Sequence, residues 1–429
     1  MQRGIKILII SWMVLLILSA CRKDEPFVYE EAYDINDFIF KTMKEDKWYY
    51  WYYNIPDIQP ETYTDPNAYL EALKYKEKDK WSYLSTRTDY TMHFEEGRYI
   101  GYGFGIGWDE NNDVRISFVY EDSPADIAGI TRGYKIMEVN GESAQSITDN
   151  NSWNTAFGPD EPGHNTSFKF EAPDSTVLSI DLSKDYVTEQ SVLHSEIFTV
   201  DNVKTGYMVL KSFIEPTEAE LEETFSRFQS ENISELIVDL RYNPGGRVNI
   251  AAILGSYICG NTAEGQVFAK LSYNKIKTGN DHYFFFQNLQ YSLSLERAIF
   301  ITSASTASAS ELVINSLFPF MEVAVIGDDT HGKPVGMNSF KYGNYVLLPV
   351  CFHTVNASNE GDYFNGIPAD AYTKDGLNKV FGDTTEPSLQ EAVYYIRNNS
   401  FSQKSMMKSM KEHSRSVTWK GLRAEIGAF

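Results

Sequence analysis

From about residue 195 to residue 330, short apolar runs alternate with longer amphipathic segments. The apolar runs have the length and content of buried strands, and the longer segments repeat their apolar positions at helical spacing. The expected strands are 205–213, 234–241, 297–303 and 322–327, and the expected helices are 217–232, 248–258 and 309–318. Thr217 and Glu220 form a capping-box signature at the start of the first helix. This alternation predicts a mostly parallel sheet flanked by helices, with ligands bound beyond the carboxyl ends of the strands.

The two preceding segments have different patterns. Residues 33–85 are rich in aromatics at helical spacing, and Asp65-Pro66 is a helix-start signal. A small helical domain is expected there. Residues 98–182 instead show short alternating strands, a brief helix closed by Gly129, and an Asn140-Gly141 pair typical of a hairpin turn. This second segment is expected to be a β-rich domain.

The N-terminus has the pattern of a secretory signal. Arg3 and Lys6 precede an apolar run, residues 7–18, that ends at Ser19-Ala20-Cys21. A membrane-spanning helix needs roughly 20 apolar residues, so this run is too short for one. Leu18 to Cys21 resembles a bacterial lipobox, which implies a signal peptide over 1–20, an acylated Cys21, a tether over 21–34, and a lipid-anchored protein of the cell envelope. An ordinary signal peptide with an incidental cysteine is the alternative, and the membrane face stays open.

Composition narrows the function classes. A formal charge of −21 argues against nucleic acid, because neutralising phosphates requires clustered Lys and Arg. Cys259 and Cys351 lie in apolar stretches and are expected to be buried free thiols rather than a disulfide. The seven histidines are scattered, so neither a metal site nor any cofactor is expected. The basic tail, 401–429, is expected to be a loosely held helix or disordered, with contact to a membrane surface as an alternative.

One stretch of the sequence contains several candidate catalytic residues. Residues 301–317, "ITSASTASASELVINSL", place several hydroxyl side chains between a strand and a helix. Ser308 followed by Glu311 fits a capping box. The same serine suits a nucleophile, because it lies at a helix start beyond a buried strand, where free backbone N–H groups stabilise negative charge. The N–H of Ala309 is one candidate oxyanion donor, and the turn containing Gly245 and Gly246 offers a second.

A nucleophilic serine also needs a base. His331 is one candidate, but Lys333 lies on the loop after the next predicted strand, at the same edge of the sheet as Ser308. A lysine acts as a base only if its pKa falls from about 10.4 toward roughly 7–8, a destabilisation of the ammonium by about 4 kcal/mol. Burial in an apolar groove has this effect.

These residues carry a resemblance. "DLRYNPGG", "TASASELV" and "GKPVG", in this order, resemble motifs of the C-terminal processing, or tail-specific, serine peptidases. The resemblance implies that Ser308 is the nucleophile and Lys333 the base of a Ser–Lys dyad that cleaves proteins or peptides. It also implies a multidomain α/β fold. The expected parts are a helical N-terminal domain (35–96), a PDZ-like β-rich domain (97–186) and a crotonase-like α/β peptidase core (187–400), followed by the tail.

The resemblance extends to substrate recognition but is incomplete. In a PDZ-like domain the glycine-rich stretch 103–107 would bind the free C-terminus of a protein partner, with Gly105, Ile106 and Gly107 as the carboxylate-binding residues. Residues 364–370, "FNGIPAD", resemble a late segment near the active-site groove. Many relatives carry a glutamine four residues after the lysine, where this chain has Met337; Asn338 is a candidate substitute. This departure favours the alternative function, a non-catalytic PDZ lipoprotein that binds peptides as a scaffold. The oligomeric state stays open.

Overall fold

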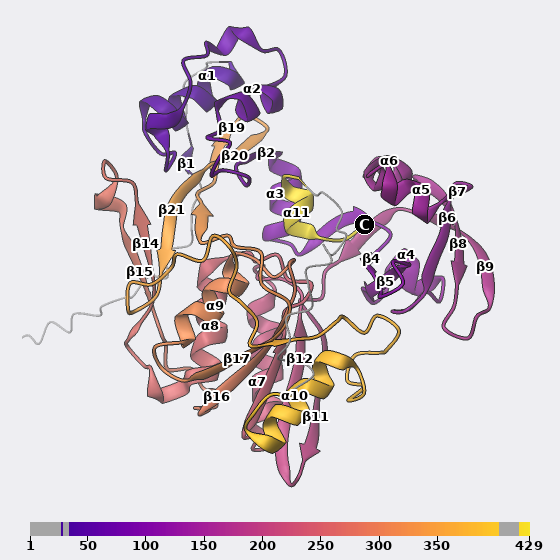
Figure 1. The fold of residues 1–429 in the computed structure, drawn as a ribbon. Helices are drawn as coiled ribbons and strands as arrows, with labels where there is room; N and C mark the ends of the chain where they lie inside the picture. The colour runs from indigo at the N-terminus through magenta and orange to yellow at the C-terminus, as the bar shows by residue number, and fades with distance from the viewer. Residues whose placement is uncertain (1–26, 29–33, 403–419) are drawn as a thin grey trace, which may run out of the picture.

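The structure is a computed structural model that describes residues 27–28, 34–402 and 420–429 (Figure 1). The predicted signal peptide, the lipobox with Cys21 and residues 403–419 of the tail lie outside the described residues. Within the described ranges, no helix combines the length and apolar character needed to cross a membrane.

The α/β core forms as the sequence pattern predicts. Its six-stranded sheet has the order β11-β12-β13-β16-β17-β22, in which β11 is antiparallel to β12 and the other pairs are parallel. The strands are β11 (Val192–Val200), β12 (Val203–Leu210), β13 (Glu235–Asp239), β16 (Arg297–Thr302), β17 (Glu322–Gly327) and β22 (Ala371–Tyr372). The helices are α7 (Thr217–Ser230), α8 (Val248–Cys259), α9 (Ala309–Leu317) and α10 (Pro387–Asn398).

Helices cover both faces of this sheet. Alternate residues of each strand point to opposite faces. Met208 and Leu210 of β12 accordingly join the core cluster with α7, α8 and α9, whereas Tyr207 and Val209 join the cluster with α10. Because both faces are buried, the strands are continuously apolar, which explains why the sequence shows them so clearly.

The start of α7 differs from its prediction. Pro216, not a hydroxyl residue, precedes the helix, and Thr217 is its first residue. The carboxylate of Glu220 accepts hydrogen bonds from the N–H groups of Ser191 and Val192, at 3.0 and 2.7 Å. The capping box predicted for Thr217 and Glu220 is therefore wrong. Glu220 accepts its hydrogen bonds from N–H groups at the start of β11, not from the start of its own helix.

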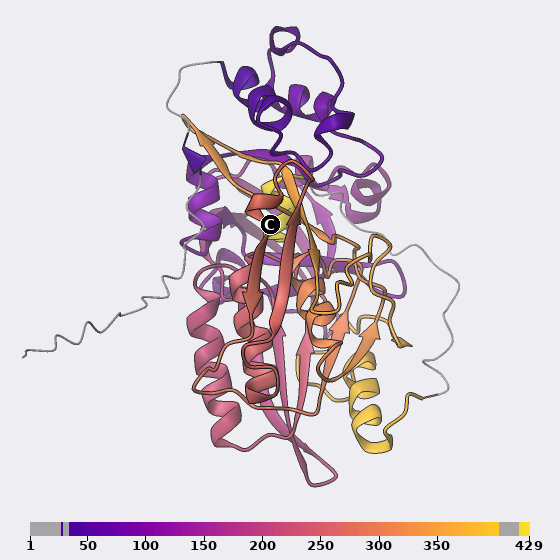
Figure 2. The same cartoon turned by 90° about the vertical axis from the view of Figure 1, so that its left-hand side faces the viewer.

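The N-terminal region is helical, but it does not have a core of its own. It contains α1 (Ile35–Phe40), α2 (Pro66–Leu73), α3 (Arg87–Phe94) and short turns of π- and 3₁₀-helix. The part with α1 and α2 lies at one end of the molecule in Figures 1 and 2, whereas α3 lies nearer the core. Asp65 caps α2 as expected, accepting from the N–H of Asn67 at 3.0 Å. Its aromatic cluster includes residues from later strands, among them Phe340 and Cys351.

Two small sheets carry this connection. A four-stranded sheet, β1-β19-β20-β2, joins the region to the core; its strands are β1 (Phe27–Val28), β2 (Tyr83–Thr86), β19 (Phe340–Tyr342) and β20 (Tyr345–Leu348). A second sheet, β15-β14-β21-β18, comprises β14 (Val267–Tyr273), β15 (His282–Phe285), β18 (Val335–Met337) and β21 (Val350–Val355).

The β-rich domain packs beside the core (Figure 1). Its antiparallel sheet has the order β4-β5-β6-β8-β9, with β7 paired to β6. The elements are β4 (Phe104–Trp108), β5 (Val114–Val119), α4 (Pro124–Ile127), β6 (Lys135–Val139), β7 (Glu142–Ser143), α5 (Ala144–Asp149), α6 (Trp153–Phe157), β8 (Asn165–Glu171) and β9 (Val177–Ser183). Asn140 and Gly141 both have positive φ between β6 and β7, so the predicted hairpin is confirmed. β3 (Arg98–Gly101) and β10 (Asp185–Thr188) pair where the domain joins the rest of the chain.

Both cysteines of the described chain are buried free thiols, as predicted. Burial raises the pKa of Cys259 and of Cys351 to about 12. Because the thiolate is the reactive species, neither should react with a thiol reagent near pH 8 while the protein is folded.

In a chain carrying Cys21→Ser, we expect Ellman's reagent to detect no thiol in the native protein at pH 8 and both thiols after unfolding in guanidinium. Rapid reaction of the native protein would contradict this burial, and no release after unfolding would instead indicate a disulfide.

Candidate active site

The loops that follow four neighbouring strands meet at the carboxyl edge of the core sheet. Lys211 follows β12, the turn 241–246 follows β13, the serine-rich turn 303–308 follows β16, and Lys333 lies on the loop after β17. Parallel neighbours place their carboxyl ends together, so the candidate residues converge even though they are distant in sequence.

The hydroxyls of the serine-rich turn bind the neighbouring turn. Ser303 Oγ donates to the carbonyl of Arg241, and Thr306 Oγ1 donates to the carbonyl of Leu240 at 2.8 Å. Ser310 Oγ donates to the carbonyl of Asn243 at 3.1 Å. These side chains fix the turn in place, which explains why it carries more hydroxyls than a helix cap requires.

Ser308 has an unusual backbone conformation at the start of α9. Its φ is +57° and its ψ is −115°, a region that non-glycine residues adopt rarely and mostly at functional sites. Gly245 packs directly against it: a Cβ on Gly245 would lie 2.7 Å from the Cβ of Ser308. Only glycine therefore fits at position 245, and the close approach places the two turns side by side.

The candidate oxyanion donors differ in availability. The N–H of Gly245 already donates to Asn243 Oδ1 at 2.9 Å. Among the described residues, the N–H groups of Ala309 and Gly246 have no hydrogen-bond acceptor. Ala309 and Gly246 are accordingly better placed than Gly245 to bind a developing negative charge.

A buried carboxylate connects the serine-rich turn to the loop that carries Lys333. Glu311 Oε2 accepts from the N–H of Ser308 at 2.9 Å and from the N–H of Lys333 at 2.8 Å. Its other oxygen accepts from Thr330 Oγ1 at 2.5 Å and from the N–H of Gly332 at 2.6 Å. Burial raises the pKa of the Glu311 carboxyl, although these four donors oppose the rise. The predicted capping box of Ser308 and Glu311 is thus present, and its glutamate also holds the lysine loop.

Lys333 is buried, and its amine has a partner that the sequence did not suggest. Its Nζ lies 3.0 Å from Glu425 Oε1, and both side chains are at most 10% exposed. Asn338 does not hold the lysine, because its amide exchanges hydrogen bonds with the hydroxyl of Tyr273. Met337 ends β18 and packs with the aromatic cluster of the N-terminal region.

The alternative base, His331, is engaged elsewhere. Its Nε2 accepts from the indole N–H of Trp81 at 3.3 Å, and its Nδ1 lies 3.3 Å from the carbonyl of Ala304. The segment 364–370 packs on the same loop, where Thr330 and Ile367 exchange hydrogen bonds. These contacts make His331 a neighbour of the site and leave Lys333 as the stronger candidate base.

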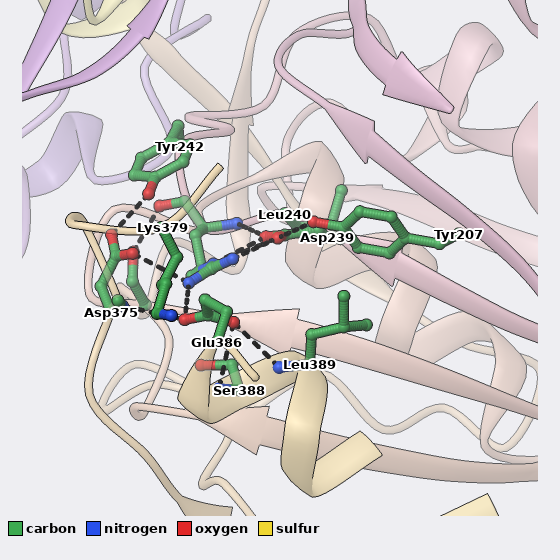
Figure 3. A network of polar contacts seen from close by, with 12 residues as sticks. Tyr207, Asp239, Leu240, Tyr242, Asp375, Lys379, Glu386, Ser388 and Leu389 are labelled. Atoms are coloured by element: carbon green, nitrogen blue, oxygen red, sulfur yellow. Dashed lines mark hydrogen bonds and ion pairs between the residues drawn. The ribbon is translucent and has the colours of Figure 1, made fainter. Parts of the chain in front are cut away.

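A network of charges fixes the turn after β13 (Figure 3). The guanidinium of Arg241 binds Asp239, Asp375 at 2.8 Å and Glu386 at 2.7 Å. Burial alone would raise the pKa of Asp375, but Arg241 and Arg132 hold it below its usual range. Arg132 belongs to the β-rich domain, so the network also fastens that domain to the core.

The last described residues of the chain pack on the β-rich domain. The carbonyl oxygen of Phe429 accepts from the N–H groups of Tyr102, Gly103 and Phe104, at 3.0, 2.8 and 3.3 Å. The residues predicted to bind a carboxylate, 105–107, lie instead inside β4 and pair with β5. The donors lie just before and at the start of the strand, where Gly103 has a φ of +91°. The N–H groups that contact Phe429 therefore belong to residues 102–104, and carboxylate binding by residues 105–107 stays a prediction.

A second buried amine, that of Lys211, contacts the same C-terminal segment. Lys211 is fully buried, and its Nζ donates to the carbonyl of Ile426 at 2.8 Å. Burial lowers its pKa to about 8, although Glu189 and Glu425 oppose the fall. Sequence reasoning missed Lys211 and Glu425, because neither belongs to a motif.

We expect Glu311→Gln to destabilise the protein by about 2–4 kcal/mol, because an amide nitrogen cannot accept the hydrogen bonds that one carboxylate oxygen now receives from two N–H groups. Urea unfolding at neutral pH measures this loss, with the exposed Glu218→Gln as the matched control. A loss no larger than that of the control would show that Glu311 does not hold the two loops.

We expect the stability of the wild type to rise with pH relative to Lys211→Met. The folded state releases the Lys211 proton near pH 8 and the unfolded state near 10.4, so between these values the unfolded state binds more protons. The relative gain should reach about 3 kcal/mol in urea unfolding between pH 8 and 10.4. The exposed Lys275→Met is the control. Parallel curves for wild type and Lys211→Met would contradict the lowered pKa.

Comparison with known proteins agrees with this geometry. The model of peptidase family S41 matches residues 204–373, and that of the peptidase S41 N-terminal domain matches residues 34–83. The carboxy-terminal processing protease CtpB of Bacillus subtilis is 24% identical over 292 residues, which cover 64% of this chain and 58% of that protein. A protein of Staphylococcus aureus described as a CtpA-like serine protease is 25% identical over 291 residues, covering 66% and 54%. The chain thus aligns with little more than half the length of these curated relatives.

Solved structures share the fold. The crystal structure of a protein of Bacteroides fragilis described as an S41 protease superposes with a TM-score of 0.67 at 22% identity, covering 87% of this chain and 99% of that one. The photosystem II D1 C-terminal processing protease gives a TM-score of 0.51 at 16% identity, covering 83% and 100%. Matched in both its core and its N-terminal region, this chain belongs to peptidase family S41.

Proposed function

We propose that this chain is a serine endopeptidase with a Ser–Lys dyad. The observation that carries the proposal is the shared carboxylate of Glu311, one oxygen of which accepts from the backbone N–H groups of both Ser308 and Lys333. It supports a geometry in which a serine at a strained helix start and a buried lysine lie on adjoining loops.

The proposed reaction has two halves. The neutral amine of Lys333 takes the proton of Ser308 Oγ as that oxygen attacks the scissile carbonyl carbon. The N–H groups of Ala309 and Gly246 stabilise the oxyanion. The lysine ammonium then gives its proton to the leaving amine as the C–N bond breaks, which leaves an ester on Ser308. In the second half the amine deprotonates a water that attacks the ester, and the proton returns to Ser308 Oγ.

We further propose that the β-rich domain is PDZ-like and binds free C-termini of protein substrates. The donors would be the N–H groups of residues 102–104, which support anion binding because consecutive N–H groups point at one oxygen. The substrate segment would add as a strand beside a sheet, with main-chain hydrogen bonds supplying affinity. The core would be crotonase-like, and the division into parts at 35–96, 97–186 and 187–400 belongs to the same proposal.

For location, we propose the bacterial cell envelope, with the protein held by lipid on Cys21. The support is the charged start, apolar run and lipobox of the sequence. The substrates would then be envelope proteins or peptides.

We expect Ser308→Ala to reduce cleavage of an unfolded protein such as casein by at least about a thousandfold, because the nucleophile is lost. Lys333→Met should have a similar effect, whereas Ser305→Ala, an exposed serine of the same turn, should not. Equal cleavage by Ser308→Ala and wild type would refute the peptidase. If no form cleaves and all bind peptides that carry a free C-terminus, the scaffold alternative stands instead.

A further inference from the structure

Phe429 exchanges backbone hydrogen bonds with the first residue of β4 in the β-rich domain. The N–H of Phe429 donates to the carbonyl of Phe104 at 2.8 Å, and the N–H of Phe104 donates back to Phe429 at 3.3 Å. The Phe429 oxygen also accepts from Tyr102, Gly103 and the hydroxyl of Tyr99, the last at 3.2 Å. We call residues 420–429, which include α11 (Leu422–Ile426), the C-terminal segment.

The side chains of this segment fill a matching groove. Phe429 is 1% exposed, and its ring lies 4.0 Å, centroid to centroid, from the ring of Phe157 in an edge-to-face arrangement. Ala428 is 2% exposed and packs in a cluster with Tyr99, Phe118 and Tyr120. The groove therefore suits a C-terminus with an aromatic last residue and a small residue before it.

The same segment reaches the proposed dyad. Glu425, four residues before the terminus, pairs with Lys333 Nζ at 3.0 Å, and the carbonyl of Ile426 accepts from Lys211 Nζ at 2.8 Å. Leu422 packs on the cluster that contains Tyr83 and Tyr90. In Figure 1 α11 lies beside α3, with the chain end between the core and the β-rich domain.

These contacts have a chemical consequence. The Lys333 Nζ is engaged by the Glu425 carboxylate, and an amine engaged in this way is not free to take the proton of a serine hydroxyl. A segment in this position also fills the groove that a substrate C-terminus would need. Docking of the segment is therefore incompatible with both the chemistry and the recognition of a substrate.

We propose that the chain's own C-terminal segment is the resident ligand of this groove and inhibits the enzyme until another C-terminus ending in an aromatic residue displaces it. This inference rests on the proposed function, since the Glu425–Lys333 pair inhibits only if Lys333 is the base. Displacement would release Glu425 from Lys333, so that the binding of a substrate's end would switch on its own cleavage.

Two full-length variants and one peptide test the inference. Glu425→Gln removes the carboxylate charge that faces Lys333, and a Gly-Ser-Gly-Ser extension after Phe429 disrupts the docking of that residue in the groove. The apparent activity of an enzyme scales with its open fraction, so both variants should cleave casein about tenfold or more faster than wild type. The exposed Glu110→Gln is the matched control and should match wild type.

The peptide KGLRAEIGAF, the sequence of the segment, should then inhibit the extended variant, and its C-terminal amide should not. Binding is read independently by the fluorescence anisotropy of labelled peptide, which should bind the extended variant more tightly than wild type. Inhibition of the wild type should be independent of enzyme concentration, since the segment belongs to the same chain; relief on dilution would refute this intramolecular arrangement.

The two proposals fail in different ways. If wild type and both variants cleave equally and the peptide neither binds nor inhibits, the self-inhibition is refuted and the peptidase stands. If no form cleaves, the peptidase and the inhibition are both refuted, whereas specific binding of the free-acid peptide would still identify the ligand of the groove.

Discussion

The geometry of the candidate site depends on a single buried carboxylate. Glu311 accepts four hydrogen bonds, two of them from the backbones of Ser308 and Lys333. A buried carboxylate is costly unless donors surround it, so these donors and Glu311 hold one another in place. The serine-rich turn and the lysine loop are consequently fixed by contacts to their backbones, which do not depend on the side chains of Ser308 and Lys333. Glu311 thus makes no contact with the Ser308 hydroxyl or the Lys333 amine, and the amine pairs with Glu425 instead.

A second set of contacts extends the same rigidity to the β-rich domain. Arg132 donates to the hydroxyl of Tyr242 at 2.6 Å and pairs with Asp375 at 3.0 Å. Tyr242 lies three residues before Gly245, which packs against Ser308. Burying such charges contributes little net stability, because desolvation offsets the attraction, but removal of either partner leaves the other unpaired. The network therefore defines one position of the β-rich domain relative to the turn that carries candidate oxyanion donors.

Much of the core was predictable from the sequence, because the pattern of apolar residues within each strand and helix identifies that element. Strands buried on both faces read as continuous apolar runs, and the helices between them repeat their apolar positions regularly, so the order of elements from β12 to β17 follows from the pattern. The helical region was only partly predictable, because its aromatics pack on strands from residues 335–352 and so form no separate core. The capping box predicted at Thr217 was wrong for a related reason. The carboxylate of Glu220 accepts hydrogen bonds from backbone N–H groups at the start of β11, 28 or more residues earlier in the chain. The meeting of the Ser308 turn and the Lys333 loop was predictable because parallel strands place the loops that follow them at one edge of the sheet, whereas the dyad itself stays a prediction.

The contacts of the C-terminal segment were beyond such reasoning. Glu425 lies 92 residues from Lys333, and its basic surroundings in sequence suggested a loosely held tail. Only the folded chain shows that one short segment spans two sites, binding N–H groups before β4 with its end and the buried amine with its side chain. Two weak attachments on one segment reinforce each other, because the second forms at the high effective concentration set by the first. Under the proposed self-inhibition the same coupling would make release cooperative, because a competitor that binds the N–H groups before β4 would loosen the pair at Lys333 without touching it. This contact also bears on Met337, which stands where many relatives carry a glutamine. In this chain a carboxylate oxygen of Glu425, in the docked segment, contacts the amine of Lys333 instead.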